Sequence, residues 1–158
     1  MVGDSERDKA SERARLTLVL PLPPSVNHQY VTAGRRRVLS REAQSFRRDV
    51  AKTVQRLREV GKITPAIEAA LKEAYLGVRL TFFFETPYRR DLDGGLKIAL
   101  DAACDALGLD DRYVVEMLLT KRIDPLRPRL LLELVAIPDW QFDQAYVYLG
   151  PREQDGGS

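Results

Sequence analysis

The chain has 158 residues, of which 44% are hydrophobic and 30% are charged, a balance that suits one globular domain with an apolar core. Its 25 basic and 23 acidic residues leave a net charge of +2, which by itself says little about partners. One cysteine and one histidine exclude an internal disulfide and a zinc site of the Cys/His type. No apolar run reaches the length of a membrane span, and the polar start does not resemble a signal peptide. We therefore expect an intracellular, cytoplasmic protein that does not bind membranes.

Composition divides the chain into three segments. Residues 1–14 are charged and poor in large apolar groups, which predicts a flexible N-terminal arm. Residues 15–137 alternate strand-like and helix-like patterns and form the expected folded domain. Residues 138–158 form an expected C-terminal extension that is first aromatic, with Trp140, Phe142, Tyr146 and Tyr148 at even positions, and then disordered.

The first half of the domain predicts a strand at 15–22, a hairpin at 30–39, a helix at 40–61 and a shorter helix at 64–75. Ser40 and Thr64 are suitable N-caps for the two helices. Arg35, Arg36 and Arg37 lie on the returning arm of the hairpin. They are equally compatible with a solvated edge that blocks strand association and with a finger that grips DNA phosphates.

The stretch that follows a predicted strand at 78–85 carries most of the chemistry. Asp91 and Asp93 lie two residues apart, after Arg89 and Arg90 and before two glycines. Carboxylate oxygens suit hard cations such as Mg²⁺, and glycines at a helix start let a phosphate approach the backbone N–H groups. A bare D-x-D is a weak motif that also fits a helix N-cap, but a cap does not explain the flanking arginines and glycines.

A helix is predicted directly after this pair, ending at Gly108. Lys97 and Asp101 lie four and eight residues after Asp93, on the polar face of this predicted helix. Lys97 fits either a role beside a phosphate or an ordinary salt bridge one turn away. Asp110 and Asp111 follow the helix, as additional acidic ligands or as a polar turn. Two strands, at 113–123 and 129–137, complete the domain, and the turn 124–128 predicts that they form an antiparallel hairpin. If the first of them neighbours the strand at 78–85, Asp111 could approach the D-x-D pair.

The runs R-R-D-L-D-x-x-x-K and L-D-D, with P-P-S-x-N near the N-terminus, resemble RusA-type Holliday junction resolvases over residues 16–137. The resemblance implies an α+β fold with a single small mixed β-sheet packed against two main helices. It also implies a dimeric, Mg²⁺-dependent endonuclease, with Mn²⁺ as a possible substitute, that resolves four-way DNA junctions by paired nicks in recombination and repair. The segment 15–137 would then be the nuclease domain.

Carried over by position, the resemblance implies that Asp91, Asp93 and Asp111 bind the metal and that Lys97 is the essential lysine. Arg89, Arg90 and Arg35–Arg37 become DNA contacts, and Asp101 and Asp110 are additional acidic positions. Two departures stand out: Gly94 replaces a common asparagine, and the interval before Asp111 is one residue short, which leaves Asp110 and Asp111 open as the ligand. An inactive branched-DNA-binding module and a metal-dependent nuclease for RNA or another branched substrate are the alternatives.

Overall fold

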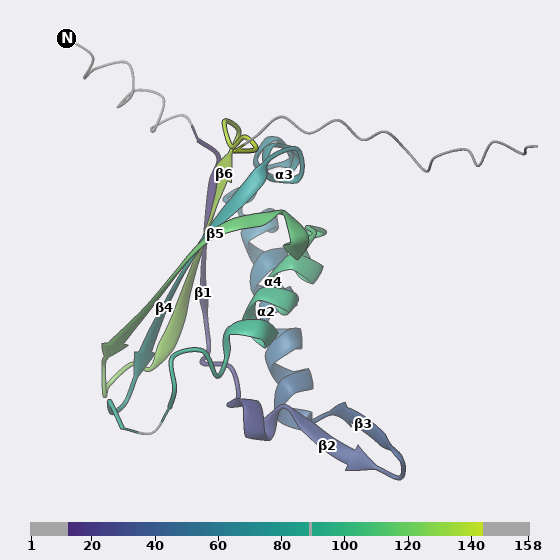
Figure 1. The fold of residues 1–158 in the computed structure, drawn as a ribbon, viewed down its shortest axis with the longest axis vertical. Coiled ribbons are helices and arrows are strands. Elements are labelled where there is room, and N and C mark those ends of the chain that lie inside the picture. Colours follow the sequence, from purple (N-terminus) through teal and green to yellow (C-terminus); the bar gives the residue numbers. More distant parts are fainter. Residues whose placement is uncertain (1–12, 89, 144–158) are drawn as a thin grey trace, which may run out of the picture.

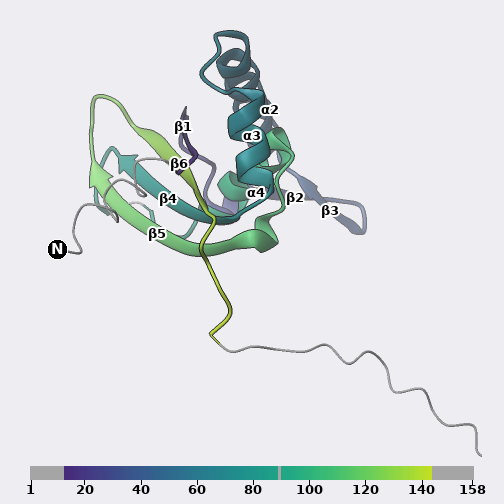
Figure 2. The same cartoon turned by 90° about the horizontal axis from the view of Figure 1, so that it is seen from above.

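The structure, a computed structural model, describes residues 13–88 and 90–143. Its main sheet has the strand order β1-β6-β4-β5, formed by β1 (Arg15–Leu20), β6 (Arg129–Ile137), β4 (Tyr75–Phe84) and β5 (Val114–Ile123). Three helices, α2 (Arg41–Glu59), α3 (Pro65–Lys72) and α4 (Leu96–Leu107), lie on one face of this sheet (Figures 1 and 2). Strands β2 (Tyr30–Ala33) and β3 (Arg36–Leu39) form a separate hairpin. The expected α+β class, with a mixed sheet and two main helices, is confirmed.

The helices begin and end where their caps predict. The Ser40 side chain accepts a hydrogen bond from the Ala43 N–H at 3.1 Å, and Thr64 caps α3 in the same way. Gly108 ends α4 with a φ of 66°, the left-handed conformation in which glycine is favoured. The second helix is shorter than expected, because Tyr75 already begins β4.

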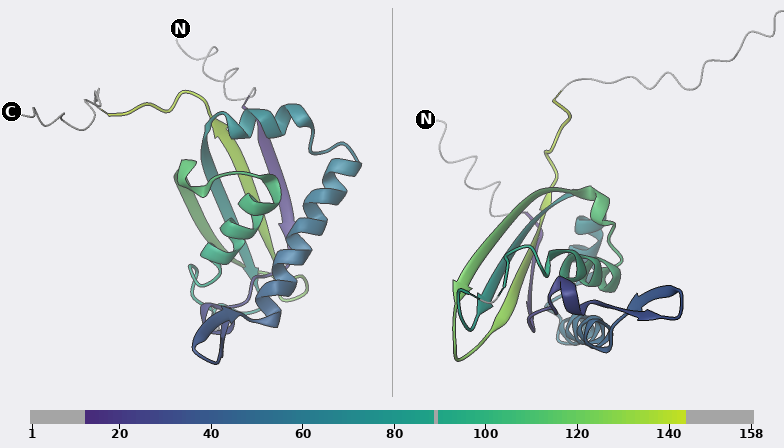
Figure 3. Two further views of the ribbon diagram at one scale, coloured as in Figure 1. Left: turned by 90° about the vertical axis from the view of Figure 1, so that its right-hand side faces the viewer. Right: turned by 60° about the horizontal axis from the view of Figure 1, so that its bottom comes forward.

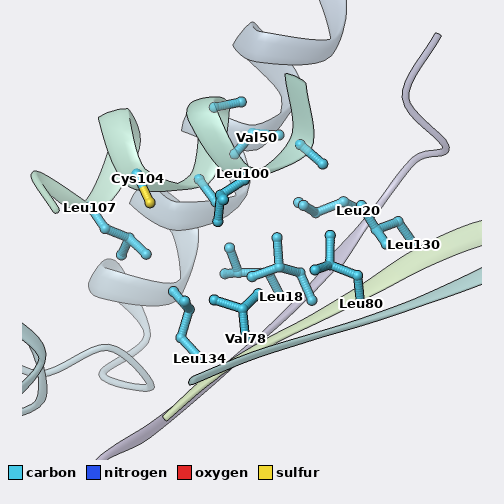
Figure 4. Packing of buried hydrophobic residues seen from close by; sticks show 14 of the residues in the cluster. Leu18, Leu20, Val50, Val78, Leu80, Leu100, Cys104, Leu107, Leu130 and Leu134 are labelled. Atoms are coloured by element: carbon cyan, nitrogen blue, oxygen red, sulfur yellow. The ribbon is translucent and has the colours of Figure 1, made fainter. Parts of the chain in front are cut away.

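The core lies between the helices and the covered face of the sheet, and Figure 4 shows its centre. Alternate residues of β1 and β6 point into it, so Leu18, Leu130 and Leu132 are fully buried. Val50 of α2 is buried against the same layer. The opposite face of the sheet carries exposed side chains, including Arg79 and Leu118.

The predicted antiparallel hairpin between the last two strands is wrong. β5 pairs with β4 in parallel, while β6 pairs antiparallel with the other side of β4 and with β1. The reason is burial. Residues 130–137 of β6 are buried or half-buried throughout, which requires a central position, whereas β5 has many exposed residues and lies at an edge. The crossover through α4 places β5 parallel to β4.

Two predicted terminal segments fall largely outside the described residues. Of the arm at 1–14, only Arg13 and Ala14 are described, and the Ala14 carbonyl accepts a hydrogen bond from Ala136 at 2.9 Å. In the C-terminal extension, Trp140 packs on Tyr75 with ring centroids 4.5 Å apart. Tyr146 and Tyr148 lie outside the described residues, so the predicted aromatic face stays a prediction beyond Asp143.

Candidate active site

Asp91 and Asp93 are exposed on the loop between β4 and α4. β4 ends at Phe84, so the pair does not extend directly from the strand as the sequence suggested. The backbone turns instead, with the Gly94 N–H donating to the Asp91 carbonyl at 3.3 Å. The helix cap is Gly95, and neither carboxylate accepts a hydrogen bond within the part of the chain that the structure describes. Capping therefore does not explain the two aspartates, and their oxygens stay available.

This loop is fixed from one side by the proline-rich segment that follows β1. The buried Gln29 side chain donates to the Pro24 carbonyl at 3.1 Å and to the Gly94 carbonyl at 2.9 Å. A Cβ atom at Gly95 would lie 2.4 Å from the Pro23 ring, so the close approach of these two segments requires glycine. These contacts at Gly94 and Gly95 therefore hold the backbone that directly follows Asp93.

Lys121 of β5 holds the loop from the other side, and Arg90 of the loop adds a second contact to the proline-rich segment. Lys121 of β5 donates to the carbonyls of Pro87 and Arg90, both at 2.8 Å. Arg90 donates to the Pro23 carbonyl, and its guanidinium lies 5.5 Å from the Phe84 ring centroid. Burial lowers the pKa of the Arg90 guanidinium from its ordinary value. Arg90, which the sequence predicted to contact DNA, therefore also stabilises the loop. Arg89, the other predicted contact in this loop, lies outside the described residues.

A second acidic pair is formed by Asp101 of α4 and by Asp111, which follows that helix. Burial, and to a smaller extent the neighbouring Asp111 carboxylate, raises the pKa of the Asp101 carboxyl. Lys97 lies 3.7 Å from Asp101, and its side chain is 81% exposed. Two adjacent carboxylates repel each other when both are charged, and a bound cation would relieve that repulsion.

The contacts distinguish Asp110 from Asp111. Asp110 accepts from the Arg112 N–H at 2.9 Å and from the Arg112 guanidinium at 2.7 Å. These bonds lower the pKa of Asp110 and make it the cap of a short turn, η2 (Asp111–Tyr113). The polar-turn interpretation thus holds for Asp110, while Asp111 faces Asp101.

An open hollow of about 530 Å³ adjoins the second pair. Its lining includes Cys104, whose pKa burial raises to about 12, so the thiol is a packing group and not a nucleophile. Arg47 of α2 forms an ion pair with Asp105 on the rim of this hollow. The basic side chain is therefore held beside the acidic ones.

The two acidic pairs do not meet within one protomer. Asp101, which lies beside Asp111, is on the second turn of α4, whereas Asp93 lies in the loop before the helix begins at Leu96. Asp111 precedes β5, whose Val114 pairs with Leu76 at the start of β4, whereas Asp91 follows the end of β4. β5 does neighbour β4, but the parallel direction keeps Asp111 away from the D-x-D pair. Within 13–88 and 90–143, no three His, Cys, Asp or Glu side chains lie close enough to hold a metal ion.

The predicted arginine hairpin lies at the same end of the molecule as the loop of Asp91 and Asp93 (Figures 1 and 3). Arg36 and Arg37 are exposed on opposite faces of the hairpin, since they are neighbours on one strand, and Arg35 is exposed in its turn. The arginines and the D-x-D loop are therefore at one end of the body, while Asp101 lies on α4 and Asp111 lies in η2, after that helix.

A comparison with protein families identifies the family of this chain. The family described as endodeoxyribonuclease RusA matches residues 21–134. The chain belongs to the RusA family. Membership implies an endonuclease that acts on DNA at Holliday junctions, and it confirms the resemblance seen in the sequence motifs. A comparison with curated proteins gave no match.

The RusA match spans every acidic residue discussed above, and also the hairpin and Gln29. Sequence reasoning missed Gln29 and Lys121 as positioning residues of this RusA-family site. Neither shows a periodic signal. The only hint for Gln29 was its place at the end of the proline-rich segment. Among the described residues, no helix is long and apolar enough to cross a membrane.

Proposed function

We propose that this RusA-family protein is a Mg²⁺-dependent homodimeric endonuclease that resolves four-way DNA junctions by paired symmetric nicks, in recombination and repair. The observation that carries the proposal is the exposed carboxylate pair Asp91 and Asp93 on a loop held from both sides, within a chain of this family. Mn²⁺, which accepts the same oxygen ligands, is expected to substitute.

The residues present fit the metal. Mg²⁺ is typically held by one or two carboxylates together with water and phosphate oxygens, and each acidic pair of this chain offers two carboxylates. Asp91, Asp93 and Asp111 would hold it, with Asp101 beside Asp111, once a movement of the loop or a second protomer brings Asp111 to the D-x-D pair. When bound, the cation would activate water and neutralise charge on the phosphodiester.

The chain's own cations have separate tasks. Lys97 presents an exposed ammonium that is oriented by Asp101 at 3.7 Å, and it can stabilise negative charge that develops on the phosphate. Arg90 uses one nitrogen on the Pro23 carbonyl and keeps further N–H donors for a neighbouring phosphate. A four-way junction presents symmetric strand pairs, so a two-fold dimer with two sites matches it.

The test is cleavage of a synthetic four-way junction with Mg²⁺, with Mn²⁺ and with chelator. Asp93→Asn should lower the cleavage rate by more than about a hundredfold, because the metal site then has one carboxylate fewer. Glu59→Gln, an exposed acid at the end of α2, is the matched control and should cleave as the unmodified protein does. Circular dichroism checks that both variants are folded.

Other outcomes would replace the proposal. Full cleavage by Asp93→Asn would remove the metal assignment. Junction binding without nicking in any divalent metal would indicate an inactive DNA-binding module. Faster cleavage of RNA or of another branched DNA in the same panel would change the substrate.

A further inference from the structure

The β2–β3 hairpin projects from the body with almost nothing packed on it (Figures 1 and 3). Every residue of β2 is exposed, and of β3 only Leu39 is half-buried. A two-stranded hairpin without a covered face is at best marginally stable in water. Its exposed apolar side chains therefore point to a surface that is covered when a partner binds.

The hairpin has one apolar face and one mixed face. Val31 and Val38 are paired in register, so they lie side by side on the same face, 51% and 38% exposed. On the other face the Arg37 guanidinium lies over the Tyr30 ring, 4.6 Å from its centroid. The valine pair thus forms a small hydrophobic surface that the described part of the chain leaves largely open.

The charge around this surface identifies the chemistry of the partner. Residues 30–39 contain three arginines and no acidic residue. Arg36 shares the face of the valines, Arg37 lies on the other face, and Arg35 lies in the turn after Gly34, which has a φ of 64°. Arginines on both faces and at the tip suit an element that has phosphates on either side of it.

The base of the hairpin is coupled to the D-x-D loop. Gln29 precedes β2, and its side chain donates to the Gly94 carbonyl at 2.9 Å. The Ser40 N–H, just after β3, donates to the Gln29 carbonyl at 2.9 Å. A single residue therefore joins the base of the hairpin to the backbone beside Asp93.

We infer that the hairpin inserts at the branch point of the DNA, where Val31 and Val38 lie against an exposed base-pair face and Arg35–Arg37 contact the surrounding phosphates. This inference rests on the proposed function. In an open four-way junction the base pairs that end the arms are not stacked on one another, so an apolar pair gains contact there with little unstacking cost. In continuous duplex, no base face is open to the valines. The hairpin would then set the position of the nick relative to the branch point.

Binding and base exposure can be tested without cleavage, in an Asp93→Asn background. The probes are a four-way junction and a matched duplex that carry 2-aminopurine either at the branch point or in an arm. The double change Val31→Thr with Val38→Thr keeps β-branching and so keeps the hairpin, but replaces one methyl of each valine by a hydroxyl. It should lower junction affinity about fivefold, leave duplex affinity unchanged, and reduce 2-aminopurine fluorescence at the branch point only.

A second variant tests the same contact in the opposite direction. Val31→Phe should raise junction affinity, because an aromatic ring stacks on a base more strongly than valine does. Replacing Arg35, Arg36 and Arg37 by alanine should weaken binding to both DNAs. It should also reduce the salt slope of the binding constant by about 0.9 for each phosphate that is no longer neutralised. Val60→Ser, at an exposed valine 63% accessible at the end of α2, is the control.

Two results would overturn the inference. In one, the threonine double variant binds and fluoresces as the Val60→Ser control does. In the other, that variant dissociates into monomers in analytical ultracentrifugation, which would make the valine face a contact between copies of the chain. Failure of the proposed function is seen separately, as a wild-type protein that binds junctions but does not cut them.

Discussion

Gly94 and Gly95, adjacent in the D-x-D loop, differ in the space available for a side chain. At Gly94 an added Cβ would meet only the Asp91 carbonyl oxygen, at an ordinary 3.5 Å, so a side chain fits. At Gly95 the added Cβ would lie 2.4 Å from the Pro23 ring, which cannot move aside as a flexible side chain could. Steric hindrance therefore does not explain why residue 94 is glycine and not the asparagine that is common at this position in the family.

We expect Gly94→Asn to fold and to cleave junctions at close to the normal rate. Gly95→Ala should lower the free energy of unfolding by about 1–3 kcal/mol through overpacking against Pro23, and should slow cleavage because the loop shifts. Urea unfolding and the junction assay measure the two effects. Equal stability of Gly95→Ala and Gly94→Ala would show that the contact with Pro23 is easily relieved.

An ion pair and a backbone hydrogen bond stabilise the turn between β5 and β6. Asp124 accepts from the Arg129 guanidinium at 2.8 Å and from the Arg127 N–H at 3.2 Å. The hydrogen bond from Arg129 is the main cause that lowers the pKa of Asp124 from its ordinary value. The charged carboxylate thus stabilises the connection that carries the chain past the end of β4.

Because the native pKa of Asp124 is lowered, its contribution to stability is complete above the ordinary value of 3.8 and disappears as the pH falls through the native value. Asp124→Asn should therefore unfold at lower urea than the unmodified protein at pH 7, and the difference should vanish in more acidic solution. Asp49→Asn, on the exposed side of α2, is the matched control. A urea midpoint difference that stays constant down to about pH 3 would contradict the ionic origin of the effect.

Across the whole molecule, the parallel pairing of β5 with β4 keeps Asp111 apart from the D-x-D pair, because Asp111 precedes β5 near the start of β4 whereas Asp91 follows the end of β4. A metal site that uses all three carboxylates then requires either a movement of the loop or a second protomer. A two-fold dimer that brings the Asp91 and Asp93 loop of one chain beside Asp111 of the other would complete the site without a movement of the loop.

This arrangement predicts complementation. Asp93→Asn and Asp111→Asn should each be inactive alone, but a mixed dimer contains one site with both normal carboxylates and should nick one strand of the junction. Subunits exchanged under mild denaturant, followed by gel analysis of nicked and resolved products, provide the measurement. Absence of nicking in a verified mixed dimer would place the metal ligands within a single protomer.

The sequence by itself determined the local elements and the chemistry-bearing residues. The caps at Ser40, Thr64 and Gly108, the arginine hairpin and the D-x-D loop were predictable because each depends on a few neighbouring residues. The tertiary structure alone decided three other features: the position of β6 between β1 and β4, the pairing of Asp111 with Asp101, and the use of Gln29 to hold Gly94. Each depends on which distant segments are buried together, and no periodic pattern along the chain records that choice.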